Sequence, residues 1–95
     1  MKANDILLAC NLYSNMYYFL QVIKATAKTV TIRRIYSNQT EGTPRPNDFM
    51  EWELERTKRI TDGKVHLSNW TVAELWDGTP VHNEHAVWGL NYNLY

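Results

Sequence analysis

Three glutamates in the middle of the chain have the spacing that most suggests a chemical role, and they are Glu51, Glu53 and Glu55. They alternate with apolar residues, and this period of two predicts a half-buried strand over 50–55. Alternate side chains of a strand project from one face about 6.8 Å apart, near the spacing of successive phosphates in a nucleic-acid strand. This acidic row is compatible with two roles: occupying a protein groove built for DNA or RNA, or forming a solvated strand face balanced by cross-strand cations.

A group of basic residues, the basic cluster, offers the opposite chemistry, and its members are Arg33, Arg34, Arg56, Lys58 and Arg59. Residues 1–64 hold ten Lys and Arg against seven acids, a charge of +3, whereas residues 65–95 hold three acids and no Lys or Arg, a charge of −3. The basic cluster would contact phosphates, helped by base stacking on Tyr13, Tyr17 or Tyr18, or would be balanced by acids within the fold. The net charge of zero disfavours binding through bulk positive charge.

Four tryptophans are many for a chain of 95 residues, and they are Trp52, Trp70, Trp76 and Trp88. A core of this size cannot bury all four, so at least one is expected to be partly exposed. Exposed Trp and Tyr are typical of protein interfaces, although a half-buried Trp that closes a barrel end is the alternative. The residues predicted to contact a protein partner are Tyr13, Tyr17, Trp88 and the acidic row.

No arrangement of residues predicts catalysis or a cofactor. The chain has four glycines, none clustered, and lacks a phosphate-binding loop, a nucleophile elbow and a base, nucleophile and orienting set. His82 and His85 flank Glu84, but after Pro80 an extended chain would point the two rings apart, so no metal site is predicted. We therefore expect a protein that is not an enzyme.

The elements that would position these residues are mostly strands. Apolar runs and alternation predict strands over 6–10, 16–23, 29–32, 50–55, 65–67 and 86–90, with a hairpin turn at Asp62-Gly63. A bulge or strand bend is expected near 33–34, to turn Ile35 toward the core. Asp48 with Glu51 resembles a capping box, so a helix over 48–60 is the alternative there. Residues 37–47 read as a surface loop and 71–76 as one helical turn. One domain, residues 1–95, is expected: a mainly β, small antiparallel barrel of five or six strands with one short helical turn.

Composition limits where the protein works. Apolar residues make up 44% of the chain and charged residues 21%, which favours a folded domain over disorder. The apolar run 6–10 is too short for a signal peptide, and no run approaches the roughly 20 residues of a membrane span. Cys10, the one cysteine, points to a reducing compartment or to no dependence on redox conditions, and with no targeting segment a cytoplasmic location is expected.

Several segments resemble one family of small proteins encoded by phages, plasmids and conjugative elements. The resemblance lies in Asp5-Ile6-Leu7, Phe19 to Lys24, Lys28 to Arg33, Phe49 to Arg59, Asp62-Gly63 and Trp76-Asp77-Gly78. It implies a Src-homology-three-like barrel, an origin in a mobile element and no assigned activity. Family members usually carry a longer loop after the first strand, beginning Trp-Gly-Tyr-Asp, where this chain has residues 11–15, so a function held in that loop would be lost or changed here.

These observations predict a non-catalytic binding protein that docks on a host protein in the bacterial cytoplasm. Combined with a mobile-element origin, the acidic row suggests inhibition of a host defence nuclease, as by an anti-CRISPR protein that occludes the nucleic-acid channel of the effector. The alternative is a nucleic-acid-binding barrel that uses the basic cluster. A third hypothesis is an assembly component that forms a homo-oligomer through its aromatic surface.

Overall fold

The computed structural model describes residues 1–38, 40–68 and 70–81, and within these ranges the chain forms seven strands. They are β1 (Ile6–Asn11), β2 (Tyr17–Ala25), β3 (Thr29–Asn38), β4 (Thr43–Phe49), β5 (Arg56–Thr61), β6 (Lys64–Leu67) and β7 (Thr71–Leu75). Within those described ranges no segment is helical. The described residues do not include the predicted strand over 86–90, nor His82, His85 and Trp88.

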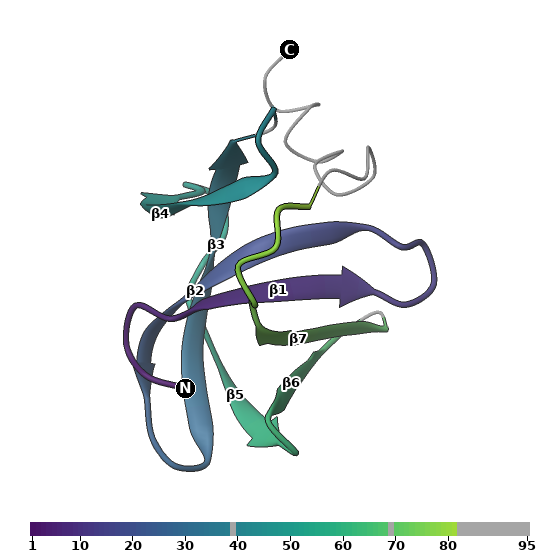
Figure 1. Cartoon of the computed structure of the whole chain (residues 1–95). Coiled ribbons are helices and arrows are strands. Elements are labelled where there is room, and N and C mark those ends of the chain that lie inside the picture. The colour runs from purple at the N-terminus through teal and green to yellow at the C-terminus, as the bar shows by residue number, and fades with distance from the viewer. Residues whose placement is uncertain (39, 69, 82–95) are drawn as a thin grey trace.

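Six of the strands close into an antiparallel barrel. Starting from β1, the order around the barrel is β2, β3, β5, β6 and β7, and β7 pairs with β1 again. β4 lies outside this ring and pairs with the C-terminal part of β3, whereas the N-terminal part of β3 pairs with β5 (Figure 1). The prediction of a small antiparallel β-barrel is therefore confirmed.

The barrel interior is filled by alternate residues of its strands. The buried cluster comprises Leu7, Ala9, Leu20, Val22, Val30, Ile32, Val65, Leu67 and Ala73. Cross-strand partners face the same side of a sheet, and pairs such as Leu7 with Leu20 and Val22 with Ile32 place these side chains together. The expected hairpin turn is also confirmed, because Asp62 and Gly63 both have positive φ, as two-residue hairpins require.

A second apolar layer lies on the outer face of the barrel. Phe19 and Ile35 are paired across β2 and β3 and are buried there, and the ring of Trp76 packs edge-on against Phe19 with ring centroids 5.5 Å apart. Beyond β7, the backbone N–H of Val81 donates a hydrogen bond to the carbonyl of Gly42 at 2.8 Å. The 76–81 segment thus connects the barrel to the turn between β3 and β4.

The expected surface loop over 37–47 is wrong, because β3 and β4 occupy most of it. Pro44 and Pro46 suggested a loop, but an outside strand tolerates proline, since one of its edges donates no hydrogen bonds to a neighbouring strand. The bulge expected at 33–34 is also wrong. The shift in β3–β4 pairing lies between Ile35 and Ser37, and Ile35 stays on the outer face, where the second apolar layer buries it.

Neither the strand over 50–55 nor the alternative helix over 48–60 forms. Residues 50–55, the 50–55 loop, connect β4 to β5 at the point where the edge of β3 changes partner from Phe49 to Arg56. At this point the N–H of Met50 donates to the carbonyl of Arg34 at 3.1 Å, but β3 pairs with β4 on one side and with β5 on the other, so the rest of the loop does not continue as a strand.

The helical turn expected over 71–76 is wrong as well, since Thr71–Leu75 is β7. Thr71 with Glu74 resembles a helix cap locally. However, β7 pairs with both β1 and β6, and its buried Thr71 and Ala73 alternate with more exposed residues. Pairing on two edges outweighs the local helix signal.

Candidate functional site

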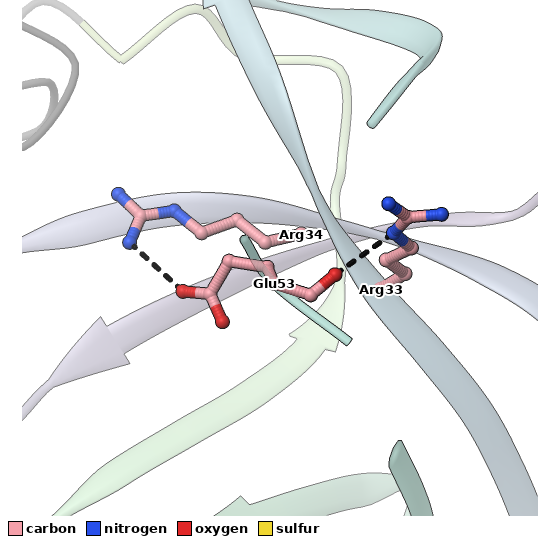
Figure 2. Close-up of polar contacts among 3 residues, drawn as sticks. All are labelled: Arg33, Arg34 and Glu53. Carbon is pink, nitrogen blue, oxygen red and sulfur yellow. Dashed lines mark hydrogen bonds and ion pairs between the residues drawn. The ribbon is translucent and has the colours of Figure 1, made fainter. Parts of the chain in front are cut away.

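Two adjacent arginines of β3 hold the 50–55 loop from opposite faces (Figure 2). Arg33 donates hydrogen bonds from Nε to the carbonyl of Glu53 at 2.9 Å and from Nη2 to the carbonyl of Met50 at 3.2 Å. Its guanidinium also lies over the ring of Phe49, 5.1 Å from the centroid. Arg33 thereby satisfies two backbone carbonyls of a loop that does not form a strand.

Arg34 lies on the inner face of β3, opposite Leu20, at one end of the barrel. Its guanidinium forms an ion pair with the carboxylate of Glu53 at 3.6 Å and lies 4.4 Å from the ring centroid of Tyr18 (Figure 2). Burial lowers the pKa of Arg34, and Glu53 and Tyr18 oppose that shift. The Nε atom of Arg34 is buried without a hydrogen-bond partner, so this arginine is held by packing as much as by its charge.

The acidic row does not form with the spacing of a strand, because the 50–55 loop turns between β4 and β5. Glu51 and Glu55 are exposed, whereas Glu53 is half-buried against Arg34. The acidic row therefore consists of two exposed carboxylates, Glu51 and Glu55, and one carboxylate, Glu53, in an ion pair with Arg34. The geometric resemblance of this row to a phosphate backbone is lost, although a role of these glutamates in protein binding stays a prediction.

The basic cluster is divided between the two faces of the sheet. Arg56 and Lys58 pair with Ile32 and Val30, so they share the inner face with Arg34. Arg59 pairs with Thr29 and shares the outer face with Arg33. Strand alternation thus separates residues that are neighbours in the sequence, and the five basic residues do not make one surface.

Large apolar side chains are exposed together where the β1–β2 loop meets the residue that precedes β7. We call this surface the aromatic end; Leu12 is 62% exposed, Tyr13 80% and Trp70 75%, and the three line an open hollow of about 470 Å³. The backbone N–H of Leu12 donates to the carbonyl of Trp70 at 2.9 Å, which joins the β1–β2 loop to the residue that precedes β7. Apolar side chains gathered in this way are typical of a binding surface.

The backbone of the aromatic end is fixed by hydrogen bonds of Asn11. Its Oδ1 accepts the backbone N–H groups of Tyr13 at 3.0 Å and of Ser14 at 2.9 Å, and its Nδ2 donates to Thr71 Oγ1 at 3.2 Å. Trp70 has a φ of +64°, a region that residues other than glycine rarely adopt. The pairing of β7 with β6 and β1 holds the backbone in this conformation.

The remaining aromatic candidates are partly engaged. Tyr17 is half-buried beside its cross-strand partner Cys10, and a hydrogen bond with Cys10 raises the pKa of Tyr17. Tyr18 is covered by Arg34, as described above. Trp52 is 57% exposed, so with Trp70 the expectation of at least one exposed tryptophan is confirmed. Asn11, Leu12 and Trp70 were not predicted as site residues. Trp70 was one of the four tryptophans of which at least one was expected to be exposed, and the sequence signal for Leu12 is an apolar residue in a loop that asparagines flank.

Within residues 1–38, 40–68 and 70–81, no group of three His, Cys, Asp or Glu side chains is placed to hold a metal ion. No helix in that part of the chain has the length and apolar character to cross a membrane. Comparisons of the chain with models of protein families, with curated proteins and with solved structures find no match. The resemblance to proteins of mobile elements therefore stays a prediction.

Proposed function

We propose that this protein is a non-catalytic binding module that docks on another protein through its aromatic end. One observation carries the proposal: three large apolar side chains, each more than half exposed, are presented on a backbone that is already ordered. An ordered surface loses little conformational entropy when it binds, so more of the contact energy remains as affinity.

The chemistry of the aromatic end favours a protein over a nucleic acid. The chain has no Lys or Arg between Lys2 and Lys24 and none after Lys64, so β1, β7, the β1–β2 loop and the turn between β6 and β7 contain no Lys or Arg. Aromatic residues that stack on bases normally stand beside cations that bind the phosphates. An uncharged apolar centre with a polar rim, here Ser14 and Asn15, is instead the arrangement of a protein interface.

The energy available is sufficient for specific binding. Full burial of an aromatic side chain removes on the order of 150 Å² from water, worth about 4 kcal/mol by area. Truncation of such an anchor typically costs at least about 2 kcal/mol of binding free energy, a factor of about 30 in affinity. Tyr13 and Trp70 are the anchors in this proposal.

The partner that the proposal favours is a host protein in the bacterial cytoplasm. This part rests on the resemblance to proteins of mobile elements, and the single free cysteine fits a reducing compartment. A defence nuclease, inhibited as by an anti-CRISPR protein, is one candidate partner. Because the acidic row is not evenly spaced, occlusion of a nucleic-acid channel by phosphate mimicry is not part of the proposal.

The proposal is tested by replacing Tyr13 with a photo-crosslinking amino acid, identifying the crosslinked protein in the host, and measuring its affinity in purified form. Trp70→Ala should weaken the purified complex at least 30-fold, whereas Trp52→Ala, the matched change at another exposed tryptophan, should change the affinity less than threefold. Equal effects of the two substitutions would refute docking through the aromatic end. A concentration-dependent homodimer that Trp70→Ala dissociates would replace the proposed partner by a second copy of the chain.

A further inference from the structure

Three neighbouring strands carry most of the positive charge and no acid. β2 contributes one Lys, β3 two Arg, and β5 two Arg and one Lys, which is six of the ten basic residues, and none of these strands contains Asp or Glu. β3 lies between β2 and β5 in the barrel. Although the net charge of the protein is zero, its positive charge is therefore concentrated on the side of the barrel that β2, β3 and β5 form.

The outer face of these strands combines cations with hydroxyl groups. Cross-strand pairing sets Lys24 opposite Thr31, Thr57 opposite Thr31 and Arg59 opposite Thr29. A hollow of about 310 Å³ on this face is lined by Lys24, Ala25, Thr26, Thr29, Thr31 and Thr57. We call Lys24, Thr31, Thr57 and Arg59 the hydroxyl–cation face; Lys28 lies beside it in the β2–β3 turn, where its backbone N–H donates to Oγ1 of Thr26, a residue that lines the hollow.

This face has a hydroxyl donor that its own hydrogen bonds do not require. Thr31 Oγ1 and Thr57 Oγ1 are 2.9 Å apart, and one hydrogen suffices for that bond. Because Thr31 is buried and Thr57 is exposed, Thr57 can donate its O–H outward when Thr31 supplies the hydrogen of the pair. Among the described residues, the ion pairs join Arg34 to Glu53, Arg45 to Asp48 and Lys64 to Glu74. The exposed cations Lys24, Lys28 and Arg59 take part in none of them.

We propose that the hydroxyl–cation face binds the phosphodiester backbone of a nucleic-acid strand. Cations and hydroxyl groups are the side chains that contact phosphates, and on this sheet they repeat at about 4.8 Å across strands and about 7 Å along them. No exposed aromatic ring accompanies them on the facing positions of β3 and β5, namely Thr29, Thr31, Thr57 and Arg59. Binding is therefore sequence-independent and driven by counterion release.

This site differs from the aromatic end in position and chemistry. It involves β2, β3 and β5 and the turn between β2 and β3, whereas the aromatic end lies at the ends of β1 and β7. It also shares only Arg59 with the basic cluster, since Arg34, Arg56 and Lys58 face inward and the guanidinium of Arg33 binds the 50–55 loop. The two sites can be tested separately.

The test titrates fluorescently labelled 20-nucleotide single-stranded DNA, single-stranded RNA and duplex DNA with the full chain between 50 and 200 mM salt. Three to four phosphate contacts predict a slope of log K against log salt of about −2 to −3, which weakens single-strand binding about 20- to 50-fold over that range. The three nucleic acids identify which source of phosphodiester is preferred. Absence of salt-sensitive binding to all three, or binding only to anionic lipid vesicles, would overturn the proposal.

A pair of matched variants separates a local site from net charge. Lys24→Glu with Arg59→Glu should weaken binding at least 30-fold, whereas Arg45→Glu with Lys64→Glu, which changes the net charge equally, should weaken it less than fivefold. Equal losses would contradict a local site. Should the first variant fail to fold by circular dichroism, Lys24→Ala with Arg59→Ala is the substitute, with a reduced salt slope as its readout. Thr57→Val should weaken binding severalfold while leaving the slope unchanged.

Discussion

Docking of the 76–81 segment on the β3–β4 turn is tested by adding a single methyl group at Gly42. This glycine has a φ of +70°, and a Cβ built on it would overlap the backbone carbonyl of Val81. Gly63 provides the matched control, because its φ is +75° and no atom lies within 4 Å of a Cβ at that position. Alanine at both sites therefore carries the same backbone strain, but only at Gly42 does it displace a neighbour.

The magnitudes follow from these two terms. A residue other than glycine in the left-handed region costs about 1–2 kcal/mol, which is the full expected effect of Gly63→Ala. Gly42→Ala adds the loss of the hydrogen bond from Val81, about 1 kcal/mol, and looser packing of the segment beside Trp76. We expect Gly42→Ala to lower the free energy of unfolding by about 2–4 kcal/mol, and each kcal/mol corresponds to roughly 4–8 °C in Tm for a domain of this size.

The assay is urea denaturation of both variants, together with hydrogen exchange of the Val81 amide. Gly42→Ala should be the less stable by at least about 1 kcal/mol, and it should lose protection of that amide, whereas Gly63→Ala should keep it. Equal destabilisation with unchanged protection at Val81 would refute the reasoning that this segment is docked on Gly42.

Three further predictions concern the 50–55 loop, the aromatic end and the turn after β7. Arg34→Ala should lower the free energy of unfolding by about 1–3 kcal/mol in urea denaturation, because it leaves the half-buried carboxylate of Glu53 without its cation. Asn11→Ala should speed hydrogen exchange of the loop amides of Tyr13 and Ser14, which donate hydrogen bonds to the Asn11 side chain, and should lower the free energy of unfolding by about 1–2 kcal/mol. The hydrogen bond from the backbone N–H of Thr79 lowers the pKa of the Asp77 carboxyl in the folded protein. The stability that this turn contributes is therefore present above the pKa of the unfolded chain and is lost as pH falls through the pKa of the folded protein. An NMR titration of Asp77 should give a midpoint below the ordinary value of 3.8.

The sequence predicted the elements correctly where the local pattern of residues and the final strand pairing agree. The apolar runs of β1 and β2 and the Asp62-Gly63 turn were predicted, because each depends on residues adjacent in the chain. The 50–55 loop was not, since its alternation is that of a strand and only the change of partner along β3 prevents it from continuing as one. β7 likewise carries a helix-like cap, and its two strand neighbours lie far away in the sequence.

The candidate sites depended even more on register. Arg33 and Arg34 are adjacent, yet one lies on each face of β3, so a cluster in the sequence became two sets of cations. Lys24 joins Arg59 on one face through pairing with β3, which no local pattern indicates. At the aromatic end, Tyr13 was predicted as a binding residue, whereas its meeting with Trp70 required the closure of β1 on β7.

The central claim is that the aromatic end is the surface that meets a protein partner. The most direct measurement is NMR detection of the indole N–H signals of Trp70 and Trp52 with a soluble paramagnetic agent, in the free protein and in the purified complex. The account predicts that both indoles are accessible to the agent in the free protein and that only Trp70 becomes shielded in the complex. A complex in which Trp70 stays as accessible as in the free protein would contradict it.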